Sequence, residues 1–305
     1  MSMEEVADSV RRIIKRWCWV ESPLVANASE GDTTIKVRST RRFAVGDEIM
    51  IFDVSEDEGE IDQTIEAIGT DAQTLTLSSP LSSDWNTSTI PVVRKLFHHQ
   101  YLEGVYLGDP AVIPKLPAVT VNPVSRQSEW ITIDSTKETY NLQIGVFVED
   151  TIQEDATRFL YTMVDTIQNA LKSHIYPLVS PYNTTSLTED IDTGDTTIRV
   201  SDATIFNRTD LYRILIEDPW DTEELIVVEV VDANTVRLNK PVCTPFRVAD
   251  GTIVISTQRF IYNSWPQNID YGKVFRGSLM KAATIDWFAW EEEIHDDPPR
   301  TPSIL

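Results

Sequence analysis

One seven-residue phrase occurs twice in the chain, and it limits the possible folds more than any other feature. GDTTIKV covers residues 31–37 and GDTTIRV covers residues 194–200. The match continues beyond the phrase: Phe43 corresponds to Phe206, and TLTLSSPL at residues 74–81 corresponds to TVRLNKPV at residues 235–242. Two stretches that share this much sequence are expected to fold in the same way.

Each repeat, of about fifty residues, has the pattern of a small all-β module. Apolar and polar residues alternate with period two, Thr, Val and Ile are frequent, and GD, VGDE, EDEG and VDAN turns separate the runs. This pattern predicts four or so short antiparallel strands in each repeat. Two copies are too few for a solenoid.

The N-terminal segment outside the repeats predicts an amphipathic helix. Ser2 and Glu5 have the spacing of a capping box, in which each side chain accepts from the other residue's backbone N–H. One apolar stripe follows at helical spacing: Val6, Val10, Ile13, Ile14 and Trp17.

The segment between the repeats predicts strands and a second helix. In TYNLQIGVFVED, alternate residues share one strand face: Tyr140, Leu142, Ile144, Val146 and Val148. Thr151 and Glu154 then repeat the capping-box spacing, and an apolar helical stripe continues until Pro177. Its members are Ala156, Phe159, Leu160, Met163, Val164, Ile167 and Leu171. After the second repeat, residues 279–290 predict a closing strand before an acidic tail.

Together these patterns predict an α+β fold: a small mixed or antiparallel sheet with two packed helices, interrupted by two homologous all-β insertions. Surface insertions cost little closure entropy when the ends of the core stay adjacent. The expected segments are core 1–23, first module 24–97, core 98–187 with its main helix at 151–175, second module 188–256, and core 257–305.

Composition excludes several classes of protein. The formal net charge of the 305 residues is −22, which argues against a protein that grips nucleic acid through a basic surface. No run approaches the roughly 20 apolar residues of a membrane helix, and acidic residues near the start argue against a signal peptide, so we expect assembly in a cytoplasm. Cys18 and Cys243 form no disulfide framework or zinc motif.

Three acidic or histidine-bearing places in the sequence carry residues suited to chemistry. Residues 53–62 resemble a calcium loop but carry Glu58 where Gly is needed and Thr64 where the bidentate Glu is needed, which favours a solvated hairpin loop. The triplet at residues 291–293 has carboxylates for glycoside hydrolysis, but no pocket is implied, and a solubilising tail is favoured. The adjacent His98 and His99 point to opposite faces if they lie on a strand.

The remaining histidines, His174 and His295, have no partner at a metal or triad spacing, and nucleotide-binding and serine-hydrolase motifs are absent. The sequence therefore predicts no enzyme, no cofactor and no metal.

The segments outside the repeats resemble the tail terminator proteins of long-tailed bacteriophages. The resemblance rests on the N-terminal helix, on LPAVTV at 116–121, on YNLQIGVFVEDTIQEDATRFLYTMVDTIQNAL, and on the closing FRGSLMKAATIDWFAWEE. It covers about half of the chain and follows the order of elements more than a signature motif. The repeats also look like small β-insertions of phage virion proteins.

The resemblance implies a structural role in the virion. Such proteins form a six-fold ring that caps the tail tube and contacts the neck, so the implied partners are further copies of the chain, the tail tube protein, a neck or adaptor protein and possibly a sheath. DNA passes through such a ring, and an acidic lumen repels its phosphates. The two inserted repeats depart from simple terminators, so another neck or head-completion protein remains an alternative.

Grouped cations and aromatic residues are candidate docking surfaces. The cations lie in three groups: Arg11, Arg12, Lys15 and Arg16; Arg38, Arg41 and Arg42; and Lys273, Arg276 and Lys281. In so acidic a chain, such groups are candidates to contact an acidic neighbour. The alternative is that the helix arginines only favour the C-terminal end of the helix dipole and stay in water. Trp287 and Trp290, with Trp265 and Phe288, fit either a core or a subunit contact.

A second functional hypothesis is a glycan-binding tail protein whose modules contact a host surface. It requires exposed aromatic residues on the modules. The candidates are Phe43, Phe52 and Trp85 in the first repeat and Phe206, Tyr212, Trp220 and Phe246 in the second.

Overall fold

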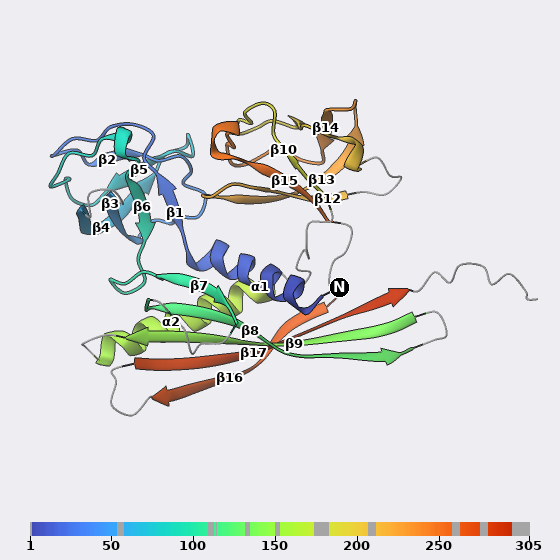
Figure 1. Ribbon diagram of the computed structural model, residues 1–305. Helices are drawn as coiled ribbons and strands as arrows, with labels where there is room; N and C mark the ends of the chain where they lie inside the picture. Colours follow the sequence, from blue (N-terminus) through green and yellow to red (C-terminus); the bar gives the residue numbers. More distant parts are fainter. Residues whose placement is uncertain are drawn as a thin grey trace, which may run out of the picture. The chain divides into compact units, whose positions relative to one another are not determined.

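The protein is described from a computed structural model (Figure 1). The described residues are 2–53, 58–108, 113, 115–131, 135–149, 153–173, 183–206, 212–257, 263–274 and 280–294. The fold is α+β and mostly β, with two α-helices and antiparallel strands in curled sheets among these residues. The chain divides into two compact units: the first comprises Met1–Ile14, Glu103–Ser180 and Arg259–Leu305, and the second comprises Lys15–Leu102 and Pro181–Gln258.

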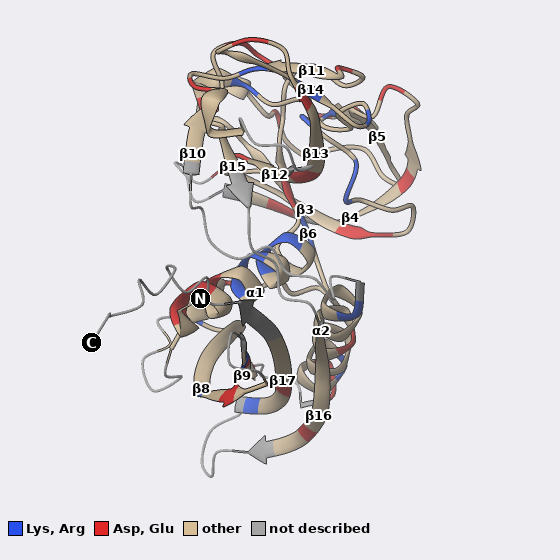
Figure 2. Cartoon of the chain, turned by 90° about the vertical axis from the view of Figure 1, so that its right-hand side faces the viewer, with Lys and Arg blue, Asp and Glu red and all other residues tan. Residues whose placement is uncertain are grey.

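The first unit contains a five-stranded sheet in the order β16-β17-β9-β8-β7. Its strands are β7 (Gly104–Leu107), β8 (Ala118–Trp130), β9 (Ser135–Glu149), β16 (Asn263–Val274) and β17 (Met280–Ile294). Only β7 and β8 pair in parallel; the other neighbours are antiparallel. The sheet is strongly curled (Figure 2).

One face of this sheet is a continuous apolar layer. The alternate β9 residues expected to share a face are all at most 1% exposed. Across the register, Ile144 lies between Val121 of β8 and Ile285 of β17, both fully buried. The period-two pattern therefore predicted the buried face correctly, because successive side chains of a strand point to opposite faces.

Helix α1 (Met3–Cys18) begins with the predicted capping box. The Ser2 backbone N–H donates to Glu5 Oε2 at 2.6 Å, and the Glu5 backbone N–H donates to Ser2 Oγ at 3.2 Å. Val6, Val10 and Ile14 of the stripe are fully buried, as expected. Trp17 is 44% exposed, so its assignment to the buried stripe was wrong.

Helix α2 (Gln153–Ser173) carries the second predicted stripe. All seven stripe residues are at most 3% exposed, and Ala170 joins them at 2%. The helix packs against the sheet strands β9, β16 and β17. Thr151 of the predicted capping box and Pro177 lie outside the described residues.

The second unit contains both repeats, and each forms a six-stranded antiparallel sheet of the same topology. The first has the order β1-β6-β3-β4-β5-β2 and the second β10-β15-β12-β13-β14-β11. The first comprises β1 (Glu21–Pro23), β2 (Thr34–Lys36), β3 (Glu48–Asp53), β4 (Glu58–Ile68), β5 (Thr74–Leu77) and β6 (Val92–Lys95). The second comprises β10 (Asn183–Ser186), β11 (Thr197–Arg199), β12 (Tyr212–Glu217), β13 (Thr222–Val230), β14 (Thr235–Leu238) and β15 (Ile253–Thr257).

Equivalent residues occupy equivalent positions in the two repeats. The isolated bridge between Ala28 and Trp85 in the first corresponds to the bridge between Ile191 and Phe246 in the second. Each repeat has its own apolar core, which contains the phrase residues Ile35 and Val37 or Ile198 and Val200. The duplicated phrase thus corresponds to a duplicated strand and its surrounding core.

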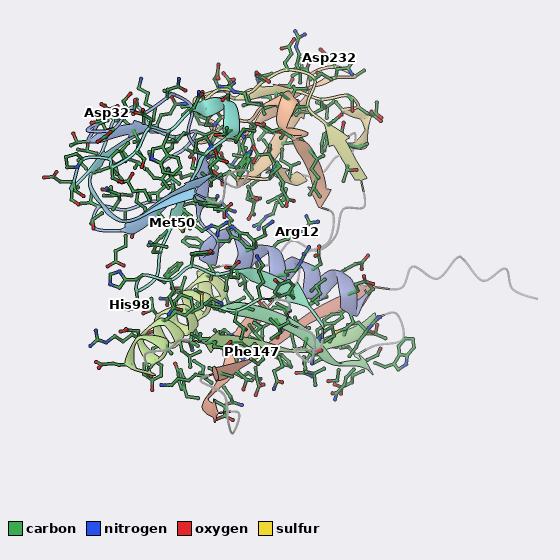
Figure 3. All side chains as sticks on the ribbon, turned by 60° about the vertical axis from the view of Figure 1, so that its left-hand side comes forward. Arg12, Asp32, Met50, His98, Phe147 and Asp232 are labelled. Carbon is green, nitrogen blue, oxygen red and sulfur yellow. The ribbon has the colours of Figure 1, made fainter. Side chains whose placement is uncertain are left out.

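Many acidic residues of the repeats form turns. Asp32 and Asp232 lie on outer turns of their sheets (Figure 3). Asp32 accepts from the Ser29 backbone N–H at 2.8 Å, and the equivalent Asp195 accepts from that of Asp192 at the same distance. Hydrogen bonds from the Asn234 backbone N–H and the Thr235 side chain hold the pKa of Asp232 below its ordinary value. Part of the acidity therefore serves turn formation.

Two expectations about chemistry-bearing residues changed. His98 and His99 lie in a turn between Phe97 and Gln100, with φ of 50° and 63°, not on a strand. Positive φ at both central residues is the geometry of a tight hairpin turn. Residues 291–293 belong to β17 instead of a tail, because the strand continues to Ile294. Residues 54–57 of the acidic loop, His174 and His295 lie outside the described residues.

Candidate functional site

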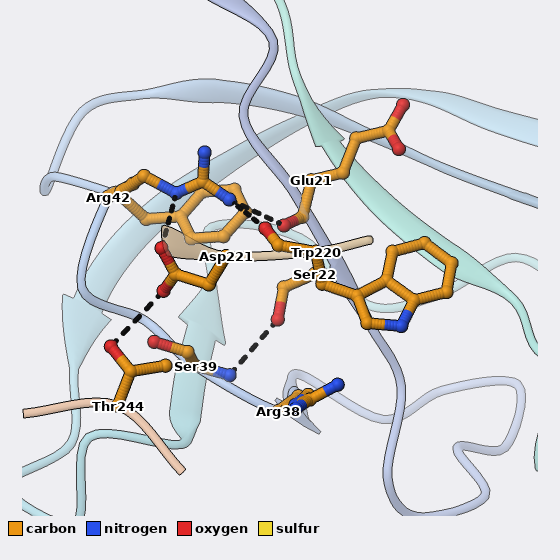
Figure 4. Close-up of a pocket in the computed structure, with 9 residues that line it drawn as sticks. Glu21, Ser22, Arg38, Ser39, Arg42, Trp220, Asp221 and Thr244 are labelled. Atoms are coloured by element: carbon orange, nitrogen blue, oxygen red, sulfur yellow. Dashed lines mark hydrogen bonds and ion pairs between the residues drawn. The ribbon is translucent and has the colours of Figure 1, made fainter. Parts of the chain in front are cut away.

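Three arginines of the first repeat contact four carboxylates of the second, within the second unit; Figure 4 shows one of these contacts, between Arg42 and Asp221. We call this set the arginine seam; it comprises Arg38, Arg41, Arg42, Asp218, Asp221, Glu223 and Asp250. The arginines follow strand β2, where the repeat phrase ends. In the second repeat the equivalent positions hold Ser201, Thr204 and Ile205, so only one repeat supplies the cations.

Arg38 is the most deeply placed of the three. Its Nη2 lies 2.5 Å from Asp218 Oδ2, and its Nη1 lies 2.5 Å from Asp250 Oδ2. Nη2 also donates to the Pro245 carbonyl oxygen at 3.1 Å. The Arg38 side chain is 8% exposed and that of Asp218 is 0% exposed. A buried guanidinium needs such paired acceptors, because an unpaired buried charge is strongly unfavourable.

Arg42 joins the second repeat to the end of helix α1. Its guanidinium donates to the Trp220 carbonyl oxygen and, at 2.9 Å, to the Arg16 carbonyl oxygen. Its Nε lies 3.7 Å from Asp221 Oδ1. The last carbonyls of a helix have no partner within the helix, and a basic side chain at this end also matches the helix dipole.

The carboxylates are held in place by their own repeat. Asp218 accepts from the backbone N–H groups of Trp220 at 2.8 Å and Asp221 at 2.7 Å. Burial raises the pKa of Asp218 above its ordinary value, although Arg38 and these N–H groups oppose the rise. Glu223 is fully buried and accepts from the backbone N–H groups of Cys243 and Thr244, at 2.9 and 3.1 Å. Asp218 and Glu223 are therefore held by backbone N–H groups of their own repeat as well as by the arginines.

A buried glutamate at the Glu223 position occurs in both repeats. Glu60 pairs with Ile51 as Glu223 pairs with Ile216, and it accepts from the Ser82 backbone N–H at 3.0 Å. Ser82 and Cys243 are equivalent in the repeat alignment. We call Glu60 and Glu223, with the backbone N–H groups that they accept from, the glutamate clamp of each repeat. It was not predicted from the sequence, where its only signal is an acidic residue at an inward position of an alternating strand.

The arginine seam is a structural joint. Three residues of the seam, Arg38, Arg42 and Asp221, line a cavity together with residues such as Glu21 and Phe43. Its volume is about 10 Å³, close to the space of one water molecule. No organic ligand fits there. Among the described residues, no three histidine, cysteine or acidic side chains gather to hold a metal ion. In the same part of the chain, no helix has the length and apolar character to cross a membrane.

The other predicted docking cations are dispersed. Arg11 and Arg12 both bind Asp8 one turn away, at 2.6 and 3.0 Å. Burial lowers the pKa of Arg16, a shift that Asp221 opposes and that Arg41 and Arg42 reinforce. Lys15 lies over the Trp19 ring at 5.5 Å, and Lys281 contacts Thr157 of α2. The side chain of Lys273 is not described, and Arg276 lies outside the described residues.

The tryptophans that were candidates for a docking surface differ in how deeply they are buried. Trp287 is 1% exposed in the core of the first unit, which removes it from the candidate docking surface. Its burial follows from its position in β17, directly opposite Leu142 on the apolar face. Trp290 is half-buried, with the Lys137 ammonium 5.3 Å from its ring. Trp265 is 38% exposed and packs its ring against Phe288 at 4.9 Å.

No protein-family model matches the chain, and no curated protein matches it.

Proposed function

We propose that the chain is a structural protein of a long-tailed phage virion: a tail terminator that forms a ring, caps the tail tube and joins it to the neck. The observation that carries the proposal is the set of helices and strands that make up the first unit. Two helices and a five-stranded sheet are built from three separate stretches of sequence. The order of these elements is the one on which the resemblance to tail terminators rests.

The proposed architecture is a terminator-like core with two homologous β-modules inserted in it. Lys15–Leu102 and Pro181–Gln258 interrupt the three stretches of the first unit, and each contains one repeat. The shared strand order of the two sheets supports a common origin of the insertions. The arginine seam supports the further idea that the two modules act as one body.

The proposed mechanism is binding without turnover. Six copies would carry a formal charge of six times −22, or −132, and an acidic lumen would let DNA pass without adhering. The proposed partners are other copies of the chain, the tail tube protein, a neck or adaptor protein and possibly a sheath protein. Assembly would take place in the host cytoplasm.

The alternative is that the chain is another neck or head-completion connector. Such a protein would assemble through the same kinds of contact. The glycan-binding hypothesis gains no support. Of its candidate aromatic residues, Phe43, Trp85, Phe206 and Phe246 are at most 7% exposed and belong to the module cores. Phe52 and Trp220 are half-buried, and the Tyr212 side chain is not described.

The native mass of the full chain tests the proposal, measured by light scattering with negative-stain imaging of the same fraction. A ring with a central hole and a mass near six times 34.6 kDa is the expected result. A chain that stays monomeric at high concentration and does not bind isolated tail tubes would contradict it.

A further inference from the structure

Two exposed tyrosines form a pair where helix α2 lies beside the edge strand β16 (Figure 2). Tyr161 of α2 is 49% exposed, and Tyr271 of β16 is 42% exposed. Their ring centroids lie 5.0 Å apart, edge to face, with 84° between the ring planes. Aromatic rings that are presented together on a surface are typical of sites that bind proline-rich segments.

Opposite charges flank this pair along α2. Arg158 lies three residues before Tyr161 and Asp165 lies four residues after it, so the three side chains share one stripe of the helix. Both charged residues are exposed, and the ion pair of Arg158 with Glu154 is a surface contact that contributes little. Burial raises the pKa of Tyr271, and the nearby charge of Asp165 adds to the rise. The stripe is thus positive, aromatic and negative in that order.

The sequence beyond β17 is proline-rich. Residues 295–305 read HDDPPRTPSIL and lie outside the described residues. Pro299 and Pro302 have the PxxP spacing, which favours a polyproline II helix with three residues per turn. Segments of this kind bind aromatic surfaces at a low cost in conformational entropy, because they bind in the conformation that they prefer.

The charges of this segment match those of the helix stripe. Asp297 and Arg300 are three residues apart, so in a polyproline II helix they share one edge and lie about 9 Å apart. Arg158 and Asp165 are seven residues apart on α2, which corresponds to about 10 Å. A segment that lies along α2 in the same direction therefore sets each of its charges beside an opposite one.

We propose that residues 297–302 of one copy of the chain bind across Tyr161 and Tyr271 of another copy, as a polyproline II helix. The edge that carries Pro299 and Pro302 packs on the two rings, and the charged edge lies over the stripe of α2. The inference goes beyond the proposed ring and does not depend on it, since this contact ties copies together whatever their number.

The register of β17 indicates that the tyrosines belong to another copy. Tyr271 lies opposite Ala283 of β17, and eleven residues, about 36 Å of strand, separate Ala283 from Ile294. The five residues from Ile294 to Pro299 span at most about 18 Å. The segment is therefore too short to follow the strand back to the tyrosines of its own copy, whereas those of a neighbouring copy can lie within its reach.

Binding of a synthetic peptide to the full chain tests this inference. A fluorescein-labelled peptide of residues 295–305 is titrated with the full chain, and fluorescence anisotropy gives the dissociation constant. The chain carries Pro299→Ala and Pro302→Ala, so that its own segment does not compete. We expect saturable binding of the native peptide, and a peptide with the same two substitutions should bind about tenfold more weakly.

A charge exchange supplies the second measurement. A peptide with Arg300→Asp should bind about tenfold more weakly, because it brings two negative charges together. Asp165→Arg in the chain should restore the binding of this peptide and weaken that of the native one. Glu30→Arg, at an exposed acidic position of the second unit, is the matched control and should change neither.

Substitution of one ring separates packing from charge. Tyr271→Ala should weaken binding about tenfold, and Tyr271→Phe should retain it, because the ring makes the contact. No saturable binding of the native peptide, or equal binding of the native and Arg300→Asp peptides, would overturn the inference. A ring whose chains do not bind the peptide would contradict this inference alone, and a chain that binds the peptide but forms no ring would contradict the proposed function alone.

Discussion

The two repeats have the same strand order, the same bridge positions and the same buried glutamate, yet they differ sharply at one surface. The first carries Arg38, Arg41 and Arg42, and the second carries Ser201, Thr204 and Ile205 at the equivalent positions. In the second repeat, the carboxylates that receive the arginines are pinned by backbone N–H groups. The core thus preserves the fold, and a few surface side chains give each copy a distinct role.

This difference makes the contact directional. The first repeat supplies the cations and the second the anions, so the second repeat cannot use its equivalent surface to bind another copy in the same way. Opposite charges set the orientation and suppress wrong pairings more than they add affinity. The joint therefore favours one arrangement of the two modules.

The largest expected effect comes from Arg38→Met. The substitution leaves Asp218 buried without its cation, and breaking a buried pair in this way costs about 3–5 kcal/mol. Urea unfolding, followed by a signal from the second unit, should show this loss in the free energy of unfolding. Ser201→Ala, at the equivalent position of the second repeat, is the control and should cost about 1 kcal/mol through its hydrogen bonds. Equal losses from both variants would remove the distinction between the repeats.

The glutamate clamp should behave alike in both repeats. Glu60→Gln and Glu223→Gln each replace a buried charged acceptor of backbone N–H groups, which should cost about 1–3 kcal/mol. The Glu223 variant should be the more costly of the two, because Arg41 Nη1 also lies 3.4 Å from this carboxylate. Thermal or urea unfolding of the two variants measures both losses in the free energy of unfolding. If one variant were neutral, the two positions would not be equivalent.

A smaller effect concerns pH. The pKa of Asp218 is raised in the folded chain, so its contribution to stability is complete below the unfolded pKa of about 3.9 and is lost as pH rises through the folded value. The difference in unfolding free energy between the native chain and Asp218→Asn should therefore fall as pH rises above about 4. A difference that grows over this range would mean that Arg38 outweighs burial.

The sequence predicted the parts of the fold that depend on local periodicity. The apolar stripe of α2 and the alternate residues of β9 are buried as expected, because helix and strand periods decide which side chains share a face. Ser2 and Glu5 form the expected capping box because its partners are three residues apart. Trp17 was wrongly expected to lie on the buried stripe. The helical period shows which side chains share a face, but it does not show where the neighbouring elements that cover this face end.

The arginine seam was beyond sequence reasoning. The grouping of Arg38, Arg41 and Arg42 was visible and indicated an acidic neighbour, but Arg38 and Asp218 are 180 residues apart. No local pattern indicates that the neighbour is the other repeat of the same chain. Trp287 was likewise compatible with a core or a contact, and only the register of β17 against β9 decides for the core.

The comparison of the repeats rests on one claim: that the buried Arg38–Asp218 pair holds the first repeat on the second. A double-mutant cycle with Arg38→Met and Asp218→Asn, followed by urea unfolding, tests it most directly. We expect a coupling energy of about 2 kcal/mol or more, within the range for residues of one network. The exposed pair of Arg199 and Glu189 in the second repeat, as control, should couple by less than about 1 kcal/mol. A coupling for Arg38 and Asp218 no larger than this control would contradict the claim.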